Sequence, residues 1–274
     1  MSTPTSKPAI IREETPEERQ RWRRYRWQLL IGPAFDPPMQ MALDEVLTRR
    51  VGQGRRPPTL RFWEWSAPAV VLGRFQSLRN EVNLDLARQY GITVVRRITG
   101  GGAMLTEPGR VITYSIYTLP EHVEGLSFVD SYAYLDNWVI AGLRALGIDA
   151  WYEPINDITS AAGKIGGAAQ ARRFGAVLHH VTMAYDVSPQ KVAEVLRIGQ
   201  EKLSDKGIPS AAKRVAPLRQ QTHLPREVII DHLVAVFRER YGLEPGELLP
   251  DEIAEAEELV RTKFGTEAWT AALP

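Results

Sequence analysis

The 274-residue sequence contains no cysteine, and this absence excludes several kinds of chemistry. Disulfides, thiolate metal sites and mechanisms that pass through a cysteinyl thioester all need a residue that the chain does not have. No apolar run reaches the roughly 18–20 residues that a membrane-spanning helix needs. The first residues do not resemble a signal or transit peptide, because Glu13, Glu14, Glu17 and Glu18 interrupt the arginines. We therefore expect a cytoplasmic protein without a membrane partner.

Neither sign of charge dominates the chain. The 34 Lys and Arg residues against 33 Asp and Glu residues give a net charge of +1, so no bulk field recruits nucleic acid. The hydrophobic fraction of 44% is that of an ordinary globular protein with a sizeable core. Residues 1–26 are polar and charged without an apolar period, which predicts a mobile N-terminal arm before a globular domain over 27–274.

The apolar pattern alternates between helical and extended periods. It predicts a helix over 41–51 after Pro37-Pro38, and another from Phe128 to Leu146 between Ser127 and Gly147. Further helices are expected near 189–197, 226–241 and 250–264. Strands are expected at 60–65, 69–74, 92–97 and 111–119, and as a hairpin over 164–187. Because there is no regular βαβ rhythm, the pattern favours the α+β class.

A run of three glycines follows two arginines in the segment Arg96-Arg97-Ile98-Thr99-Gly100-Gly101-Gly102-Ala103. Glycines let the backbone approach a ligand, and several N–H groups can then converge on an anion. The arginines could add paired contacts to phosphate or carboxylate. The plain alternative is a tight turn. The segment matches neither the dinucleotide-binding nor the P-loop pattern.

The 164–187 hairpin places a lysine beside small residues. With the turn centred near Phe174, strand alternation predicts Lys164, Gly166 and Ala168 on the same face as His180 and Thr182. A lysine above such a trough can hold an anion, whereas the alternative is a solvated surface lysine. Asn156-Asp157 has the composition of a turn. His179 is expected in the core, and no set of side chains has metal-ligand spacing; His122, His223 and His232 are expected at the surface.

The segment RRITGGGAM (96–104) closely resembles the RRxSGGGAV signature of the lipoate-protein ligase A family, in the superfamily of biotin-protein ligases and octanoyltransferases. Other blocks agree in the same order: MALDEVL (41–47), LRFWEWSAPAVVLGRFQ (60–76), NDI (156–158), GKIGGAAQARRFGAVLHH (163–180), KGIPSAAKRV (206–215) and LPDEIAEAEELVRTKFGTEAWT (249–270). The resemblance covers about residues 27–270. It implies an α+β catalytic domain with a mixed β-sheet flanked by helices.

The resemblance also implies a reaction and its site. ATP, with Mg²⁺, would adenylate lipoate to lipoyl-AMP, which a lysine of a lipoyl-domain acceptor would attack; such acceptors are the glycine cleavage H-like and 2-oxoacid dehydrogenase E2 types. By position, Lys164 would be catalytic, contacting the lipoyl carbonyl and the α-phosphate. Arg97 and Thr99 would line the pocket, and Asp157 would help to place Mg²⁺ or phosphate. A loop around the adenylate would comprise Gly101, Gly102, Ala103, Met104 and Leu105, with His180 and Thr182 on the adenylate side.

Three departures from the family pattern bear on the reaction. Thr106 stands where the family often has histidine, and Val181 replaces the glycine of a His-His-Gly-Thr pattern. The chain ends at Pro274, so the small C-terminal accessory domain of many ligases is absent, and a separate accessory subunit could supply it. We expect a lipoate-protein ligase or its large catalytic subunit. The alternatives are an octanoyl or lipoyl transferase that works without an acyl-cysteine, and a non-catalytic lipoyl-AMP-binding module.

Overall fold

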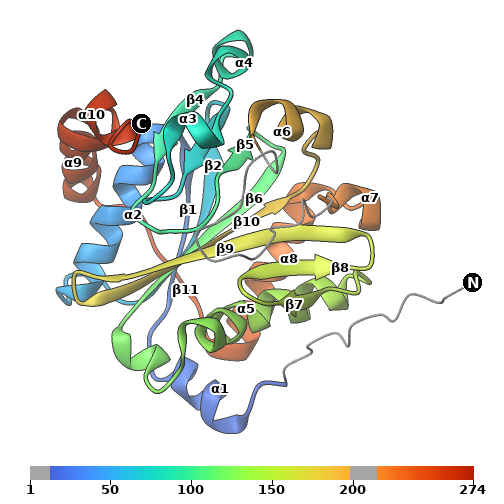
Figure 1. Cartoon of the computed structure of the whole chain (residues 1–274). Coiled ribbons are helices and arrows are strands. Elements are labelled where there is room, and N and C mark those ends of the chain that lie inside the picture. The colour runs from blue at the N-terminus through green and yellow to red at the C-terminus, as the bar shows by residue number, and fades with distance from the viewer. Residues whose placement is uncertain (1–12, 198–214) are drawn as a thin grey trace, which may run out of the picture.

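The computed structural model describes residues 13–197 and 215–274, and its strands form two sheets (Figure 1). The larger sheet has the order β11-β1-β2-β6-β10-β9-β8-β7, and the smaller has the order β4-β3-β5. In the larger sheet β1 runs parallel to β11 and β2, while the remaining neighbours are antiparallel. In the smaller sheet β3 is parallel to β4 and antiparallel to β5. The predicted α+β class with mixed sheets is confirmed.

Every predicted helix and strand is present, and the structure adds elements that the pattern did not predict, among them the strand Gln28–Phe35. The strands of the large sheet are β1 (Gln28–Phe35), β2 (Thr59–Trp65), β6 (Val111–Thr118), β7 (Trp151–Glu153), β8 (Asp157–Ser160), β9 (Gly163–Arg173), β10 (Ala176–Ala184) and β11 (Glu244–Pro245). Those of the small sheet are β3 (Ala69–Leu72), β4 (Thr93–Arg96) and β5 (Met104–Thr106). The helices are α1 (Pro16–Arg23), α2 (Pro37–Gly52), α3 (Leu78–Glu81), α4 (Leu84–Gln89), α5 (Phe128–Ala145), α6 (Pro189–Val195), α7 (Arg219–Thr222), α8 (Arg226–Tyr241), α9 (Pro250–Leu259) and α10 (Glu267–Thr270). A 3₁₀ turn spans Pro120–Val123, and a π-helical turn spans Val260–Phe264.

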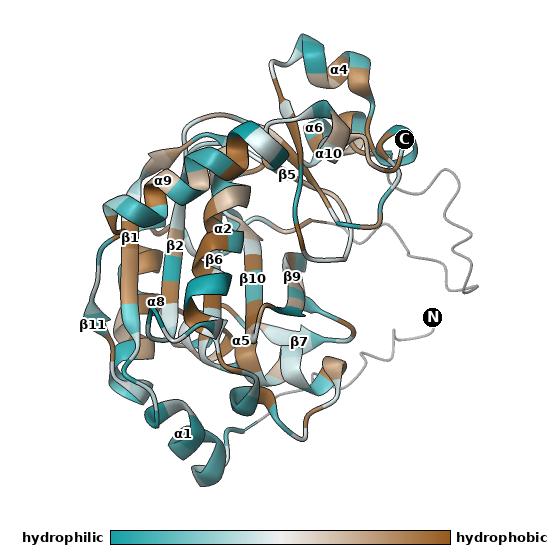
Figure 2. Cartoon of the chain, turned by 90° about the vertical axis from the view of Figure 1, so that its left-hand side faces the viewer, coloured by the Kyte–Doolittle hydropathy of each residue, from teal (hydrophilic) through white to brown (hydrophobic). Residues whose placement is uncertain are grey.

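Both faces of the large sheet are covered, which explains why every residue of β6 is buried. Ile112 and Ile116 face the core formed with α5 and α8. Val111 and Tyr117 belong to a second core, which includes α2 and the small sheet. Figure 2 shows β1, β2, β6, β10 and β9 side by side, with apolar residues concentrated in the interior. The turn between β4 and β5 lies against β9, since a Cβ on Gly101 would be 3.8 Å from the Cβ of Ala169, and this contact brings the small sheet to the predicted site residues.

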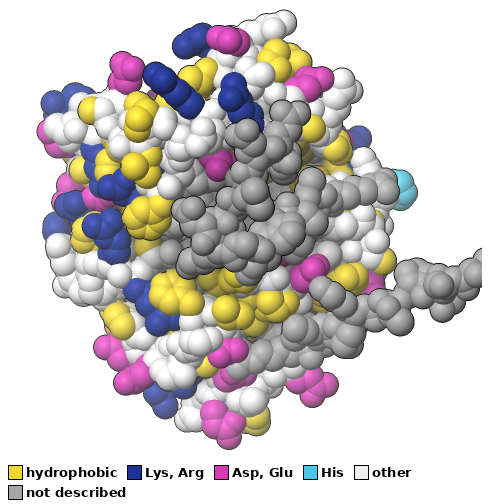
Figure 3. Space-filling view, viewed as in Figure 1, with side chains coloured by type: hydrophobic (Ala, Val, Ile, Leu, Met, Phe, Trp, Pro, Cys, Tyr) yellow, Lys and Arg dark blue, Asp and Glu magenta, His cyan; other side chains and the backbone are white. Residues whose placement is uncertain are grey.

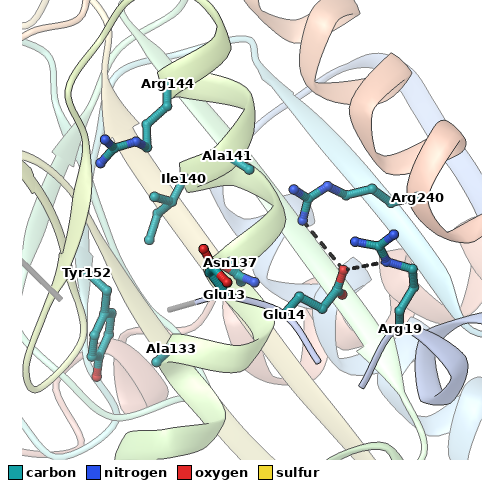
Figure 4. Close-up of a pocket in the computed structure, with 10 residues that line it drawn as sticks. All are labelled: Glu13, Glu14, Arg19, Ala133, Asn137, Ile140, Ala141, Arg144, Tyr152 and Arg240. Carbon is teal, nitrogen blue, oxygen red and sulfur yellow. Dashed lines mark hydrogen bonds and ion pairs between the residues drawn. The ribbon is translucent and has the colours of Figure 1, made fainter. Parts of the chain in front are cut away.

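The N-terminal segment differs from the predicted mobile arm wherever it is described. Thr15 and Glu18 form a capping box for α1, whose Trp22 is fully buried and stacks on Tyr241 with ring centroids 4.4 Å apart. Glu14 lies between Arg19 and Arg240 (Figure 4) and accepts a hydrogen bond of 2.5 Å from the Tyr241 hydroxyl. Residues 13–26 are therefore part of the domain, because one large aromatic ring in the core anchors a charged helix.

The same aromatic cluster corrects the prediction for His122. Its side chain is fully buried, with its ring 4.3 Å from that of Trp22 and edge-on to it. Its Nδ1 lies 3.0 Å from the Thr118 hydroxyl. Burial lowers the pKa of His122 to about 3, so the imidazole is neutral in the core.

The charges of the described surface are mixed. In Figure 3, basic and acidic side chains both occur across the visible part of one face, in agreement with the net charge of +1. Within residues 13–197 and 215–274, no helix combines the length and the apolar character needed to cross a bilayer. The block KGIPSAAKRV (206–215) lies outside the described residues except for Val215, which forms a β-bridge with Lys164.

Candidate active site

The glycine-rich segment joins β4 to β5 as a turn that touches the end of β3. Gly101 has a φ of +85°, a conformation that favours glycine. A Cβ atom on Gly73 would lie only 2.0 Å from the carbonyl oxygen of Gly101, so the two backbones are in direct contact. Gly101, Gly102 and Ala103 thus form the turn. The glycines therefore serve close backbone packing, and Gly101 and Gly102 are also exposed at the surface.

Met104 and Leu105 lie in a strand and not in the predicted loop of five residues, and their contact with a ligand stays a prediction. Both belong to β5, where Leu105 pairs with Val70 and Met104 pairs with Val71. Leu105 is only 5% exposed and packs in the core between the sheets. Met104 and Leu105 belong to the small sheet directly after the turn. The loop therefore comprises only the glycine-rich part of the segment.

Arg97 lies beneath the glycine turn and is 4% exposed. Its Nη2 donates to the carbonyl oxygens of Gly100 at 2.5 Å and Gly102 at 2.9 Å, and its Nη1 donates to that of Val71 at 3.1 Å. Its Nε donates to the Thr99 hydroxyl at 2.9 Å. Burial lowers the pKa of Arg97 to about 10, which leaves it charged at neutral pH. Arg97 therefore holds the turn from inside, where the sequence analysis had expected it to line the pocket.

Arg96 points the opposite way, because successive strand residues face opposite sides. It donates to the carbonyl oxygens of Thr270 at 2.7 Å, Gln76 at 2.7 Å and Gly73 at 3.0 Å. The suggestion that both arginines contact an anion is therefore wrong for Arg96, which ties the C-terminal segment to the loop after β3. Burial and the neighbouring Arg74 lower the pKa of Arg96.

The hairpin of β9 and β10 closes through a two-residue turn at Phe174 and Gly175, which changes the predicted register by one residue. Arg173 pairs with Ala176, so His180 lies opposite Ala169 and Thr182 lies opposite Gly167. The prediction had placed Gly166 and Ala168 on that face. Ala168 instead faces the core with α5 and α8. His179 is buried on that side too, as predicted.

Lys164 nevertheless reaches the predicted face because β9 is irregular there. Thr159 pairs with Lys164 while Ile158 pairs with Gly166, so Ile165 is an extra residue in the strand. The Nζ atom of Lys164 lies 2.8 Å from Oδ1 of Asp157, and the lysine side chain is 34% exposed. A Cβ on Gly167 would lie 3.1 Å from this Nζ. Gly167 therefore leaves room for the amine, which a larger residue would crowd.

The lysine and the glycine turn meet on one face of β9. Gly167 lies under the amine, and the next residue on the same face, Ala169, lies under the turn: its Cβ is 3.8 Å from the position of a Cβ on Gly101. Two same-face positions of a strand are roughly 7 Å apart. The predicted juxtaposition of a cationic amine and a triple-glycine bend is thus present in the structure.

A buried polar network supports the turn from behind. The Nε2 of His180 lies 2.7 Å from the Thr99 hydroxyl, and its Nδ1 lies 2.7 Å from Oδ2 of Asp44. Burial lowers the pKa of His180. Thr182 lies further along β10, where its hydroxyl is 3.1 Å from that of Thr113. His180 and Thr182 therefore sit on the same sheet face as the amine, as predicted, with His180 buried.

The sequence analysis missed the other half of this network. Asp44 of α2 is 2% exposed and accepts hydrogen bonds from the hydroxyls of Ser115 at 3.0 Å and Tyr117 at 2.5 Å. One signal was available: in the strand 111–118, Thr113, Ser115 and Tyr117 alternate with Ile112, Tyr114 and Ile116. Polar groups at every second position of a wholly buried strand require partners on one face.

One carboxylate beside Lys164 bears on whether the site fits a metal ion that arrives with phosphate. Among the described residues, no three His, Asp or Glu side chains form a group that could hold a metal. Asp157 offers a carboxylate at the edge of the site, 7% exposed and paired with Lys164. Mg²⁺ is commonly bound through one or two carboxylates together with substrate phosphates. Asp157 fits that role for an ion whose other ligands come from a nucleotide and water.

Comparison with known proteins gives consistent relatives. Residues 36–239 match the family described as the lipoyl protein ligase A/B catalytic domain. Octanoyltransferase LipM of Moorella thermoacetica is 31% identical over 271 residues, which cover 89% of this chain and 97% of that protein.

Two solved structures extend the comparison to the fold. One is described as a bi-partite lipoate protein ligase and its E2 lipoyl domain from Thermoplasma acidophilum; it matches with a TM-score of 0.76 and 30% identity, over 91% of this chain and 96% of that chain. The other is a lipoate-protein ligase A bound with ATP, which matches with a TM-score of 0.75 and 27% identity, over 91% of this chain and 99% of that chain.

Proposed function

Because this chain belongs to the lipoyl protein ligase A/B family of catalytic domains, we propose that it is an ATP-dependent lipoate–protein ligase or the large catalytic subunit of one. The observation that carries the proposal is the Lys164 amine, which lies over Gly167 beside a glycine turn whose carbonyls are held by Arg97. A positive charge thus lies beside a glycine-rich turn, whose backbone N–H groups are of the kind that binds anions. Such an arrangement suits a ligand with a carbonyl and a phosphate close together.

The first step joins lipoate to the nucleotide. A carboxylate oxygen of lipoate attacks the α-phosphorus of ATP, the bond to the bridging oxygen breaks, and pyrophosphate leaves. Lys164 stabilises the negative charge that develops on the α-phosphate, and the N–H groups of the turn surround the phosphate oxygens. Mg²⁺ would supply further neutralisation of the phosphates when bound, and Asp157 is the carboxylate that would contact it.

The second step transfers the acyl group. The neutral ε-amine of a lysine on a lipoyl domain attacks the acyl carbon of lipoyl-AMP, an amide forms, AMP leaves and the amine gives up a proton. Lys164 stabilises the negative charge on the carbonyl oxygen when the acyl carbon becomes tetrahedral. The Thermoplasma ligase, which is described together with its E2 lipoyl domain, supports an acceptor of that kind. Its bi-partite nature also supports a separate accessory subunit for this chain.

An octanoyltransferase is the second candidate, because relatives such as the Moorella protein carry that name. The chain has no cysteine. An acyl-cysteine intermediate therefore cannot form on it, and a transferase would have to pass the acyl group directly from donor to acceptor. An acyl-adenylate needs no such residue, which favours the ligase.

Intact-mass analysis of a lipoyl domain tests the proposal. The domain is incubated with this protein, ATP, Mg²⁺ and lipoate, each omitted in turn, and in a parallel reaction with an octanoyl thioester of acyl carrier protein and no ATP. A lipoyl adduct that requires ATP supports the ligase. An octanoyl adduct that forms without ATP would replace it by the transferase. Tight binding of lipoyl-AMP with no adduct in either reaction would indicate a non-catalytic binding module.

A further inference from the structure

A chain of hydrogen bonds runs from α2 through β10 to the glycine turn inside the protein. Asp44 Oδ2 lies 2.7 Å from His180 Nδ1, and His180 Nε2 lies 2.7 Å from the Thr99 hydroxyl, which accepts from Arg97 Nε at 2.9 Å. None of the four residues is more than 5% exposed. We propose that Asp44 and His180 are positioning residues that hold Thr99 and Arg97, and through them the glycine turn, in one conformation. We call these four residues, Asp44, His180, Thr99 and Arg97, the relay. The identity of the ligand that the turn binds rests on the proposed function, whereas the existence of the relay does not.

The direction of each hydrogen bond follows from the chemistry of its partners. Arg97 can only donate and an ionised carboxylate can only accept, so the Thr99 oxygen accepts from Arg97 and His180 Nδ1 donates to Asp44; in a neutral imidazole Nε2 then accepts from the Thr99 hydroxyl. His180 Nε2 must then be unprotonated, and the ring carries its proton on Nδ1, where it donates to the Asp44 carboxylate. The depressed pKa of His180 agrees with this neutral form. Asp44 therefore selects the tautomer that lets Thr99 orient the guanidinium of Arg97.

Asp44 is itself held in place. The hydroxyls of Ser115 and Tyr117 both donate to its Oδ1, leaving Oδ2 for His180. Burying a carboxylate and a guanidinium is costly, and apolar residues of similar volume often give equal or better stability. A relay of charged groups is therefore better explained by the geometry that it imposes on the turn than by a gain in stability.

The turn depends on the end of this relay. Arg97 reaches the carbonyl oxygens of Gly100 and Gly102, on either side of Gly101 with its positive φ. If the Thr99 hydroxyl is lost, the guanidinium keeps at its Nε only the longer contact of 3.2 Å to the Gly100 carbonyl oxygen, and its orientation toward these carbonyls is less firmly fixed. The backbone of the turn, whose N–H groups are proposed to surround phosphate, would then sample other conformations.

The same strand supplies a matched control. His179, the neighbour of His180, points to the opposite face, where its Nε2 lies 2.6 Å from Asp136 Oδ1. The side chains of His179 and Asp136 are both fully buried. An Asp136→Asn substitution therefore disturbs a buried histidine–aspartate pair of the same kind without touching the relay.

The experiment compares Thr99→Val, Thr99→Ser, Asp44→Asn and Asp136→Asn in the full-length protein. Hydrogen–deuterium exchange of residues 100–104 measures the turn directly, and steady-state kinetics measures lipoyl-AMP formation from lipoate and ATP. Thr99→Val and Asp44→Asn should speed exchange in the turn and lower kcat roughly 10- to 100-fold, as small displacements of a reacting geometry do. Thr99→Ser, which keeps the hydroxyl, should rescue both properties, and Asp136→Asn should leave both at wild-type values.

The outcomes separate the relay from the proposed function. If the wild-type protein neither forms lipoyl-AMP nor transfers the lipoyl group from added lipoyl-AMP to a lipoyl domain, but Thr99→Val and Asp44→Asn still loosen the turn, the relay stands and the ligase proposal fails. If wild-type protein is active and these two variants keep normal exchange and kcat, the relay is overturned. An equal loosening of the turn in Asp136→Asn would also overturn it, because the effect would then reflect general destabilisation. If Thr99→Val does not fold, Asp44→Asn alone decides.

Discussion

Replacing Lys164 by alanine should lower the rate of acyl transfer far more than it lowers the stability of the protein. The Lys164 amine is 2.8 Å from Asp157, and the lysine side chain is 34% exposed. An ion pair that solvent screens to this extent contributes at most about 1 kcal/mol, equivalent to a shift of about 2–4 °C in the melting temperature of a domain of this size. Loss of a group that stabilises charge in the transition state costs about 100- to 1,000-fold in rate, or about 3–4 kcal/mol. The catalytic effect is therefore the larger one.

The assay uses intact-mass detection of the modified lipoyl domain over time, with thermal melting of the same enzyme samples. Lys191→Ala is the matched control, because Lys191 in α6 is also partly buried and pairs with a carboxylate, that of Glu107, away from the glycine turn. This control should show a similar small loss of stability and wild-type transfer.

Two results would refute the reasoning about Lys164. Full acyl transfer by Lys164→Ala would remove the residue from the chemistry. An equal loss of activity in Lys191→Ala would show that the loss follows from weakened folding, since that lysine does not reach the turn. A rate loss confined to Lys164→Ala, with melting temperatures close to that of the wild type, is the expected outcome.

Three further predictions concern the framework of the site. Arg96→Ala should expose residues 269–273 to subtilisin, because the guanidinium binds the carbonyls of Trp269, Thr270 and Leu273; unchanged cleavage would contradict the clamp. Trp22→Ala should cost about 3–5 kcal/mol in urea unfolding, since it empties a fully buried site; a loss under about 1 kcal/mol would mean that the helix is only loosely attached. The pKa of His122 is lowered to about 3 by burial. Between about pH 6.5 and pH 3 the His122 imidazole is therefore protonated in the unfolded state and neutral in the folded state. Stability should therefore fall as the pH drops through that window, by up to about 1.4 kcal/mol per pH unit, and His122→Leu should flatten this dependence of the urea midpoint.

Much of the fold could be predicted from local pattern. The helix α5 begins after Ser127 and reaches Ala145 before the stop at Gly147, because its cap, apolar period and terminating glycine are encoded within about 20 residues. The strands β2 and β3 were expected on either side of Pro68. Their assignment to different sheets was not predictable, since it depends on partners that come later in the chain.

The candidate site was predictable in its composition and less so in its geometry. Lys164 and the glycine turn meet as expected, but through a register one residue away from the predicted one and a bulge at Ile165 that restores the lysine to the correct face. Arg97, expected at the pocket wall, lies behind the turn. Whether a buried guanidinium faces a ligand or a backbone carbonyl depends on which surfaces pack around it.

The amino-acid sequence by itself determined that a flexible glycine segment follows a strand, that a lysine stands among small residues, and that no thiol takes part. These properties are local, because residue type and spacing set backbone freedom and side-chain chemistry over a few positions. Only the tertiary structure decided that Asp44 would meet His180, since the two are 136 residues apart in the chain. Such contacts form because α2 and the small sheet pack against the large sheet. Polar groups buried there need hydrogen-bond partners.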